Sequence, residues 1–194
     1  MVVKGYTQIN NLDYFETFSP TTKLNFIRFI LSVATSKCWF LEQLGVNNVF
    51  IHGDLQEKVY MIPPPGLHLS NPQQVCKLQN FIYGLKQASR EWNFKLTSTI
   101  ISLGFVQSIF GYSFFANTKG SFFLIIFVYV DDMILTGNNV EELNVVINHL
   151  NASFRINDLG RLHFFLRLEI CPSNNGMYLI KESIVLTYTL IVTC

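Results

Sequence analysis

Residues 124–138 read LIIFVYVDDMILTGN, and two adjacent acids, Asp131 and Asp132, interrupt a run that is otherwise apolar. The preceding stretch, Phe122 to Val130, is apolar or aromatic throughout, and Met133 to Leu135 resume the pattern after the acids. Runs of this kind, rich in β-branched and aromatic residues, are typical of strands. The sequence therefore predicts two apolar strands joined by a turn at the two aspartates.

The adjacent carboxylates have two interpretations. Acidic residues are common in turns, so the pair can mark a hairpin turn and nothing more. However, two carboxylates about 4 Å apart repel by about 4 kcal/mol at an effective dielectric constant of 20, a cost that an Asn-Gly turn avoids. A bound cation removes this repulsion, and hard divalent ions such as Mg²⁺ prefer oxygen ligands. The sharper hypothesis is a metal site at the tip of the hairpin.

The composition describes a folded protein. Of 194 residues, 49% are hydrophobic and 14% aromatic, enough for one sizeable core or two small lobes. The formal net charge of +1 does not by itself indicate a nucleic-acid partner. A small basic cluster lies in the middle of the chain and consists of Lys77, Lys86, Arg90 and Lys95. It could contact nucleic acid, or it could be an ordinary solvated face.

No apolar run reaches the roughly 18–20 residues that cross a bilayer, and the N-terminal MVVKGYTQIN lacks the apolar centre of a signal peptide. We therefore expect a protein that is neither secreted nor in a membrane and acts inside the cell, in the cytoplasm or nucleus. The four cysteines (Cys38, Cys76, Cys171, Cys194) lack CxxC spacing. They predict reduced, mostly buried thiols and no zinc site.

Apolar periodicity predicts three helices, over about 21–37, over 88–103, and from Asn139 to 150, where Glu142 has capping-box spacing. Strands are expected at 39–44 and 58–62, with a turn and short helix over 45–55 and a hairpin unit over 162–180 that contains Asn175-Gly176. This order predicts an α+β fold: a small antiparallel sheet with helices on one face, the other face being free for an extended ligand.

Five blocks of the sequence resemble, in order and spacing, those of copia-type LTR retrotransposon reverse transcriptases. They are VNNVFIHGDLQEKVYMIPPPG (46–66), IYGLKQASREW (82–92), LGFVQS (103–108), FVYVDDMILTGN (127–138) and DLGRLHFFLRLEI (158–170). The resemblance covers roughly residues 2–180. We divide the chain accordingly into a reverse transcriptase region, 1–180, and a degenerate tail, 181–194.

The resemblance implies a right-hand polymerase palm with part of the fingers, and RNA-directed DNA polymerase activity. Asp131 and Asp132 take the place of catalytic, metal-binding residues. In the family, two Mg²⁺ ions about 3.5–4 Å apart stabilise the attacking and leaving oxygens of nucleotidyl transfer. The implied partners are an RNA or DNA template with its primer and a dNTP, besides other chains derived from the same polyprotein.

Further roles are carried over by position. Phe50 corresponds to an aromatic ring that crowds the 2′ position of the sugar and so favours dNTPs; its alternative role is core packing. Lys86 and Gln87 are candidate nucleotide-binding residues. Candidates for contact with template or primer are Arg90, Lys95, Phe164 and Phe165, of which the last two begin a segment, up to Glu169, that resembles a hairpin holding the primer end.

The chain departs from the family at a decisive place. The family pattern QLDVxNAF carries the first catalytic aspartate, and this chain reads QLGVNNVF with Gly45 there. Neither Glu42, on the opposite face of a regular strand, nor Asp54 is expected to replace it. We therefore predict impaired or absent catalysis. The alternatives are an active polymerase with a relaxed metal site, a non-catalytic nucleic-acid-binding remnant, and a fragment without function.

Other departures agree with a decayed sequence. Ser89 replaces a usual proline, Gly111 stands where an acid is usual, and Arg167 replaces a glycine. The chain is also expected to lack most of the fingers and the thumb.

Overall fold

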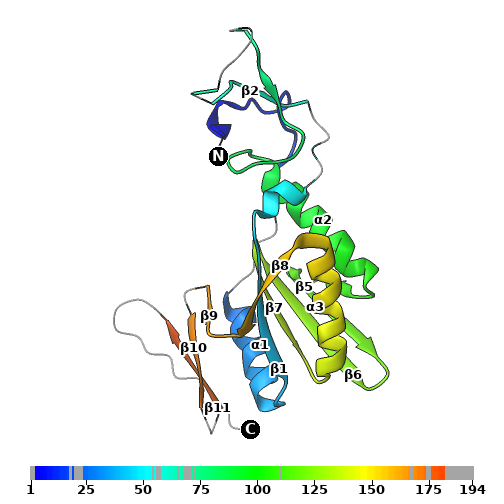
Figure 1. The fold of residues 1–194 in the computed structure, drawn as a ribbon. Coiled ribbons are helices and arrows are strands. Elements are labelled where there is room, and N and C mark those ends of the chain that lie inside the picture. Colours follow the sequence, from blue (N-terminus) through cyan, green and yellow to red (C-terminus); the bar gives the residue numbers. More distant parts are fainter. Residues whose placement is uncertain are drawn as a thin grey trace. The chain divides into compact units, whose positions relative to one another are not determined.

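The fold was obtained as a computed structural model (Figure 1). The described residues are 3–17, 19, 24–53, 55, 58–64, 66–67, 71, 73–109, 111–166, 168–173 and 176–181. The chain forms two compact units, one built from residues 1–19 and 48–98 and the other from residues 20–47 and 99–194. Each unit is considered below by itself.

The larger unit, 20–47 with 99–194, is built on a six-stranded sheet in which every neighbouring pair is antiparallel. The strands, in their spatial order, are β4 (Val106–Ser108), β5 (Gly111–Lys119), β6 (Phe122–Tyr129), β7 (Asp132–Gly137), β1 (Phe40–Val46) and β8 (Ile156–Arg161). The apolar hairpin predicted from the sequence is β6–β7, which lies in the middle of the sheet.

Three α-helices are present in the described part of the chain, close to the predicted positions: α1 (Leu24–Ser36), α2 (Ala88–Ser102) and α3 (Val140–Phe154). The start of α3 is capped as its sequence indicates, because the Asn139 side chain accepts a hydrogen bond of 3.0 Å from the backbone N–H of Glu142. The observed elements confirm the α+β class.

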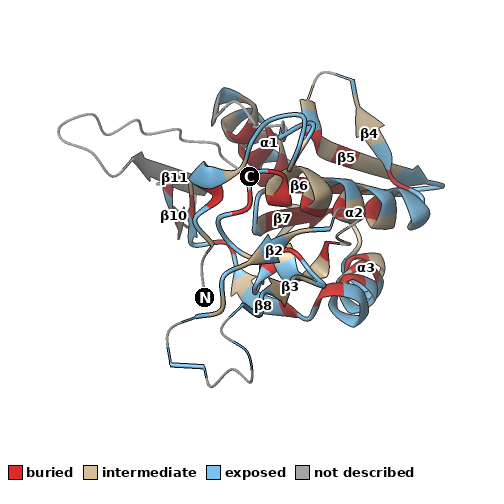
Figure 2. Ribbon diagram, turned by 90° about the horizontal axis from the view of Figure 1, so that it is seen from above, coloured by how far each residue is buried: buried red, intermediate tan, exposed pale blue. Residues whose placement is uncertain are grey.

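Helices cover both faces of the sheet, which corrects the expectation that they lie on one face (Figure 2). Ile27 and Leu31 of α1 share a buried cluster with Phe127 and Ile134. On the opposite face, Leu143 and Val146 of α3 line a small void with strand residues that include Leu124, Ile126 and Leu135.

The sequence carried a sign of this arrangement. Leu124 to Val128 in β6 and Met133 to Gly137 in β7 are buried at consecutive positions, without the alternation of a half-exposed strand. Strands buried on both faces have continuous apolar runs of this kind.

A second, three-stranded sheet packs beside α1: β9 (Phe164–Phe165), β10 (Leu168–Ser173) and β11 (Gly176–Lys181). Phe165 and Ile170 join the buried cluster below α1. Ser173 pairs with Gly176, which confirms a hairpin in this region. Its turn residues, Asn174 and Asn175, lie outside the described residues, as do Arg167 and the tail beyond Lys181.

The smaller unit, 1–19 with 48–98, has little regular structure besides the first part of α2. It contains two 3₁₀ turns, η1 (Gly5–Thr7) and η2 (Val49–His52), and a two-stranded sheet of β2 (Tyr60–Met61) and β3 (Cys76–Lys77). Phe81, Leu85 and Ala88 form its buried cluster, against which Val3 and Phe50 pack.

Two expectations that concern composition can be compared with the described residues. Cys38 is exposed and Cys76 and Cys171 are half-buried, so the expectation of mostly buried thiols is wrong for these three, while their being free agrees with it. Among the described helices, none is long and apolar enough to span a bilayer.

Candidate functional site

The tip of the β6–β7 hairpin lies one residue earlier than predicted. Tyr129 pairs with Asp132, so the two-residue loop is Val130-Asp131 and Asp132 is the first residue of β7. Val130 has a φ of 53°, a left-handed conformation that is unusual for a β-branched residue. The acids are therefore held on a strained turn whose two strands are fixed in the core of the sheet.

The end of β1 lies beside this tip. Gly45 is the pairing partner of Asp132, and the backbone N–H of Val46 donates a hydrogen bond of 2.8 Å to the carbonyl oxygen of Asp131. Position 45 and the two acids are thus joined by neighbouring backbone contacts within one unit of the molecule.

Gly45 leaves room for a side chain directed at the acids. A β-carbon at position 45 would lie 3.9 Å from Oδ1 of Asp132 and 3.3 Å from Cδ1 of Leu159. The second contact is tight, but it involves the end of a flexible side chain that is 51% exposed. An aspartate at position 45 would therefore put its carboxylate next to that of Asp132.

The electrostatics of the acid pair suit a cation. Asp131 is exposed and Asp132 is half-buried. Burial raises the pKa of Asp132 above its ordinary value, and the neighbouring Asp131 carboxylate raises it further. The ionised form of Asp132 is thus disfavoured by its surroundings, and a positive charge placed beside it would reverse that effect.

Glu42 does not take the place of the missing carboxylate. It lies three residues from Gly45 on β1, and its pairing partner is Leu135, so the two positions project from opposite faces of the strand. Burial and then Asp158 raise the pKa of Glu42, while Arg161 opposes them. Glu42 thus belongs to a separate charged group, and Asp54 lies outside the described residues.

Few candidate metal ligands gather at this place among the described residues. No group of three or more His, Cys, Asp or Glu side chains that could hold a metal occurs among the described residues. The described residues here offer two adjacent carboxylates and the backbone of Gly45. Mg²⁺ requires near-ideal octahedral geometry, and this set does not fit two such ions.

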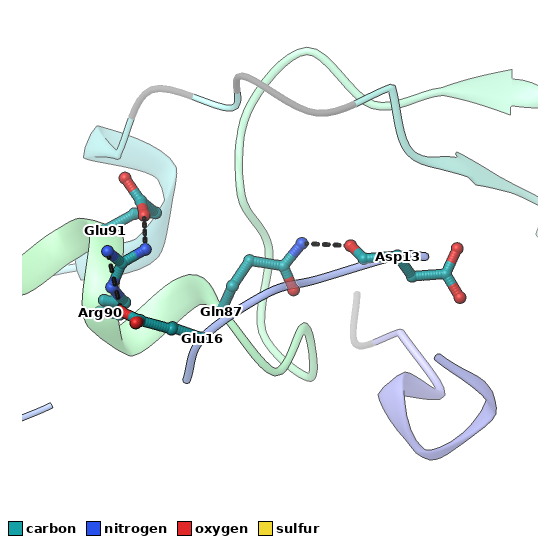
Figure 3. Close-up of polar contacts among 5 residues, drawn as sticks. All are labelled: Asp13, Glu16, Gln87, Arg90 and Glu91. Carbon is teal, nitrogen blue, oxygen red and sulfur yellow. Dashed lines mark hydrogen bonds and ion pairs between the residues drawn. The ribbon is translucent and has the colours of Figure 1, made fainter. Parts of the chain in front are cut away.

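The predicted nucleotide-binding residues Lys86 and Gln87 are engaged by the N-terminal segment of the same unit. Lys86 Nζ donates hydrogen bonds of 3.2 Å to the carbonyl oxygen of Gln8 and 3.3 Å to the Tyr14 hydroxyl. Gln87, only 1% exposed, donates a hydrogen bond to the carbonyl oxygen of Asp13 (Figure 3) and accepts one from the Gln8 side chain.

Arg90 is similarly occupied. Its guanidinium lies 3.1 Å from a Glu16 carboxylate oxygen and 3.2 Å from one of Glu91 (Figure 3). Lys95 follows on α2 and is half-buried. Binding of nucleotide or nucleic acid by these residues stays a prediction.

The aromatic candidates lie in contrasting surroundings. Phe164 is 48% exposed, whereas Phe165 is buried with its ring 5.8 Å from that of Phe127. Phe164 is therefore accessible from solvent, and the buried ring of Phe165 supports the core. Phe50 is half-buried, and its ring meets that of Tyr83 edge-to-face with centroids 4.6 Å apart. No sequence pattern marks Tyr83, because nothing local to a tyrosine in a loop reveals its partner.

A small sheet that presents paired acids at a hairpin tip, beside a strand end, is the kind of domain that the sequence blocks led us to expect. The family model for reverse transcriptase (RNA-dependent DNA polymerase) matches residues 1–188. The chain belongs to this family, and its relatives confirm the copia-type resemblance.

Three relatives are polyproteins of plant transposons. The chain is 40% identical over 187 residues to the retrovirus-related Pol polyprotein from transposon RE1 of Arabidopsis thaliana, covering 96% of this chain and 13% of that protein. It is 41% identical over 180 residues to the corresponding RE2 polyprotein of the same plant, covering 92% and 12%.

The third relative, the Pol polyprotein from transposon TNT 1-94 of Nicotiana tabacum, is 38% identical over 175 residues, or 88% of this chain and 13% of that protein. The chain thus spans about an eighth of the length of these relatives. No solved structure matches it.

Proposed function

We propose that this chain forms the palm and part of the fingers of a retrotransposon reverse transcriptase, in which nucleotidyl transfer is severely impaired or lost. Family membership supports the reaction class, an RNA-directed DNA polymerase that joins dNTPs to a primer on an RNA or DNA template. The observation that carries the impairment is the pairing of Gly45 with Asp132, which puts a residue without a side chain opposite the acids.

The expected size of the defect follows from the chemistry of the site. Removal of one preorganised oxyanion-hole donor costs about 10²–10³ in rate in known enzymes. An anionic ligand shared by two divalent ions should contribute more, since each ion would lose both a ligand and a neutralising charge. Asp131 and Asp132 would be the remaining metal-binding and catalytic residues.

Primer extension by the purified chain tests this proposal. The unaltered chain, Gly45→Asp and Gly45→Asn would be assayed with Mg²⁺ and with Mn²⁺ on the same primer–template. We expect synthesis from Gly45→Asp alone, because asparagine fills the same space without supplying a carboxylate. Robust synthesis by the unaltered chain would contradict the proposal, and so would equal recovery by Gly45→Asn.

A second candidate function, nucleic-acid binding without synthesis, is favoured by one observation. Lys86 and Phe164 are exposed, and neither needs the metal site. The logarithm of the binding constant for primer–template should then fall linearly with the logarithm of salt concentration. Lys86→Met should reduce the slope of this line by about one unit. Absence of any salt-dependent binding to primer–template would contradict both candidate functions.

We also propose the bounds of the reverse transcriptase region, its ligands and partners, and its location. We place the reverse transcriptase region at residues 1–180 and treat 181–194 as a degenerate tail. Primer–template, dNTP and Mg²⁺ are the proposed ligands, and other polyprotein-derived chains the proposed protein partners, inside the cell in the cytoplasm or nucleus.

A further inference from the structure

The Phe50 ring has support on two sides. On one side it packs against the buried cluster of Phe81, Leu85 and Ala88. On another side, the ring of Tyr83 meets it at an interplanar angle of 70° with centroids 4.6 Å apart. Edge-to-face contacts at this distance are attractive and directional. Phe50 is half-buried and Tyr83 is 37% exposed, so this pair reaches the surface of the unit.

The backbone segments that carry the two rings are also fixed to one another. Phe50 lies in the 3₁₀ turn η2. The backbone carbonyl oxygen of the following residue, Ile51, accepts a hydrogen bond of 2.9 Å from the side chain of Asn80. Asn80 stands three residues before Tyr83 in the same loop. The loop and η2 therefore form one local framework.

The Tyr83 position is held from the other direction by the N-terminal segment. Its carbonyl oxygen accepts a hydrogen bond of 2.8 Å from Val3. The following residue, Gly84, has a φ of +100°, and a β-carbon there would overlap the carbonyl oxygen of Val3. A glycine is thus required for this close approach, and the backbone at Tyr83 has little freedom to move.

From this geometry we infer that Tyr83 is a positioning residue that holds the Phe50 ring and thereby sets the discrimination between deoxyribonucleotides and ribonucleotides. The inference rests on the proposed function together with the role that the family resemblance implies for Phe50, which is to crowd the 2′ position of the sugar. An aromatic ring excludes an added hydroxyl only if the ring is held in place, because a displacement of about 1 Å is enough to change a reaction rate greatly. Without Tyr83, the outer side of the ring loses its support.

Nucleotide binding to the unaltered chain provides a test that does not need catalysis. The chain is bound to a primer–template whose primer ends in a dideoxynucleotide and whose next template base is guanine, with Mn²⁺ present. The affinities of dCTP and CTP are then measured from the slowing of primer–template release. The variants are Tyr83→Ala, Tyr83→Phe and Tyr60→Ala, the last being an exposed tyrosine of the same unit.

We expect the unaltered chain to prefer dCTP over CTP by about tenfold or more. Tyr83→Ala should lower this preference by about threefold to tenfold, chiefly through tighter binding of CTP. Tyr83→Phe keeps the ring and should keep the preference, as should Tyr60→Ala. If Tyr83 had a merely structural role, Tyr83→Ala would lower the affinities for both nucleotides alike and leave the ratio of the two affinities unchanged.

The outcomes separate the inference from the function on which it rests. If the unaltered chain binds primer–template but neither nucleotide, the nucleotide site implied for Phe50 does not form in this chain and the inference falls with it. If dCTP is preferred and Tyr83→Ala retains the full preference, the proposed function survives and the role of Tyr83 is refuted. If Tyr83→Ala unfolds, a reduced preference in Tyr83→Leu supports the inference, and an unchanged one overturns it.

Discussion

The tip of the β6–β7 hairpin and the end of β1 lie side by side in the same sheet, yet they offer different groups to the proposed site. The hairpin retains both carboxylates and a strained turn at Val130. The end of β1 retains its backbone contacts with Asp131 and Asp132 but presents Gly45 without a side chain. The comparison separates the geometry of the site from its chemistry.

The geometry persists because residues away from the site determine it. The β1–β7 register runs from Phe40–Gly137 to Gly45–Asp132, and buried pairs such as Leu44–Met133 fix it. A one-residue slip of β1 would move Leu44 and Val46 out of their buried positions. A glycine in place of an aspartate at the strand end, as we propose, would therefore leave the position of the strand unchanged.

The largest expected effect is on the free energy of unfolding, and it differs between two glycines of the paired strands, Gly45 in β1 and Gly137 in β7. A β-carbon at Gly137 would overlap the carbonyl oxygen of Phe123 and the Leu124 side chain, whereas one at Gly45 meets the flexible end of Leu159 at 3.3 Å. Gly137→Ala should lower the free energy of unfolding by about 3 kcal/mol, and Gly45→Ala should change it by less than about 1 kcal/mol.

Urea denaturation of both variants measures this difference directly. A loss of stability in Gly45→Ala as large as that in Gly137→Ala would show that the space beside Asp132 is not open. The idea of a site with intact geometry and a missing group would then be wrong.

A smaller effect concerns the strained turn. A non-glycine residue in the left-handed region costs about 1–2 kcal/mol, and a glycine loses about 0.5–1 kcal/mol more conformational entropy on folding. Val130→Gly should therefore raise the free energy of unfolding by about 0.5–1 kcal/mol. The same change at Val128, which is buried in β6, should lower it because a cavity results. Equal losses in both variants would argue against strain at Val130.

The smallest effect is a dependence on pH. The pKa of Asp132 is raised in the folded state by burial and by Asp131, from an ordinary value of 3.8. The folded chain then binds more protons than the unfolded chain between these two pKa values, so stability falls as the pH rises through that window. Asp132→Asn should remove this decline and be more stable than the unaltered chain at pH 7. Parallel stability–pH curves for the two proteins would contradict the assignment.

Much of the fold could be predicted from local patterns. The apolar periodicity placed α1, α2 and α3 within a few residues, and Asn139 marked the start of α3 because its capping chemistry is local. The β6–β7 hairpin was equally clear. The expectation that helices lie on one face was wrong, since it took no account of the unbroken burial along β6 and β7, which requires cover on both faces.

The candidate site was predictable only as far as a motif could identify it. Asp131 and Asp132 came from the apolar hairpin and its sequence block, and Gly45 from the family pattern QLDVxNAF. The pairing of Gly45 with Asp132 brings those positions together. The contact between Phe50 and Tyr83 joins segments that are distant in sequence, so no local pattern reveals it. For the same reason the partners of Lys86, Gln87 and Arg90 in the N-terminal segment could not be foreseen.

The most direct test of the central claim is a double-mutant cycle on Mn²⁺ affinity, with Gly45→Asp, Asp132→Asn and the combination measured by calorimetry beside the unaltered chain. If position 45 and Asp132 are two walls of one metal site, Gly45→Asp should tighten binding strongly only while Asp132 is present, with a coupling of at least about 1.4 kcal/mol, or tenfold. Additive effects, with Gly45→Asp tightening Mn²⁺ equally when residue 132 is asparagine, would contradict the account.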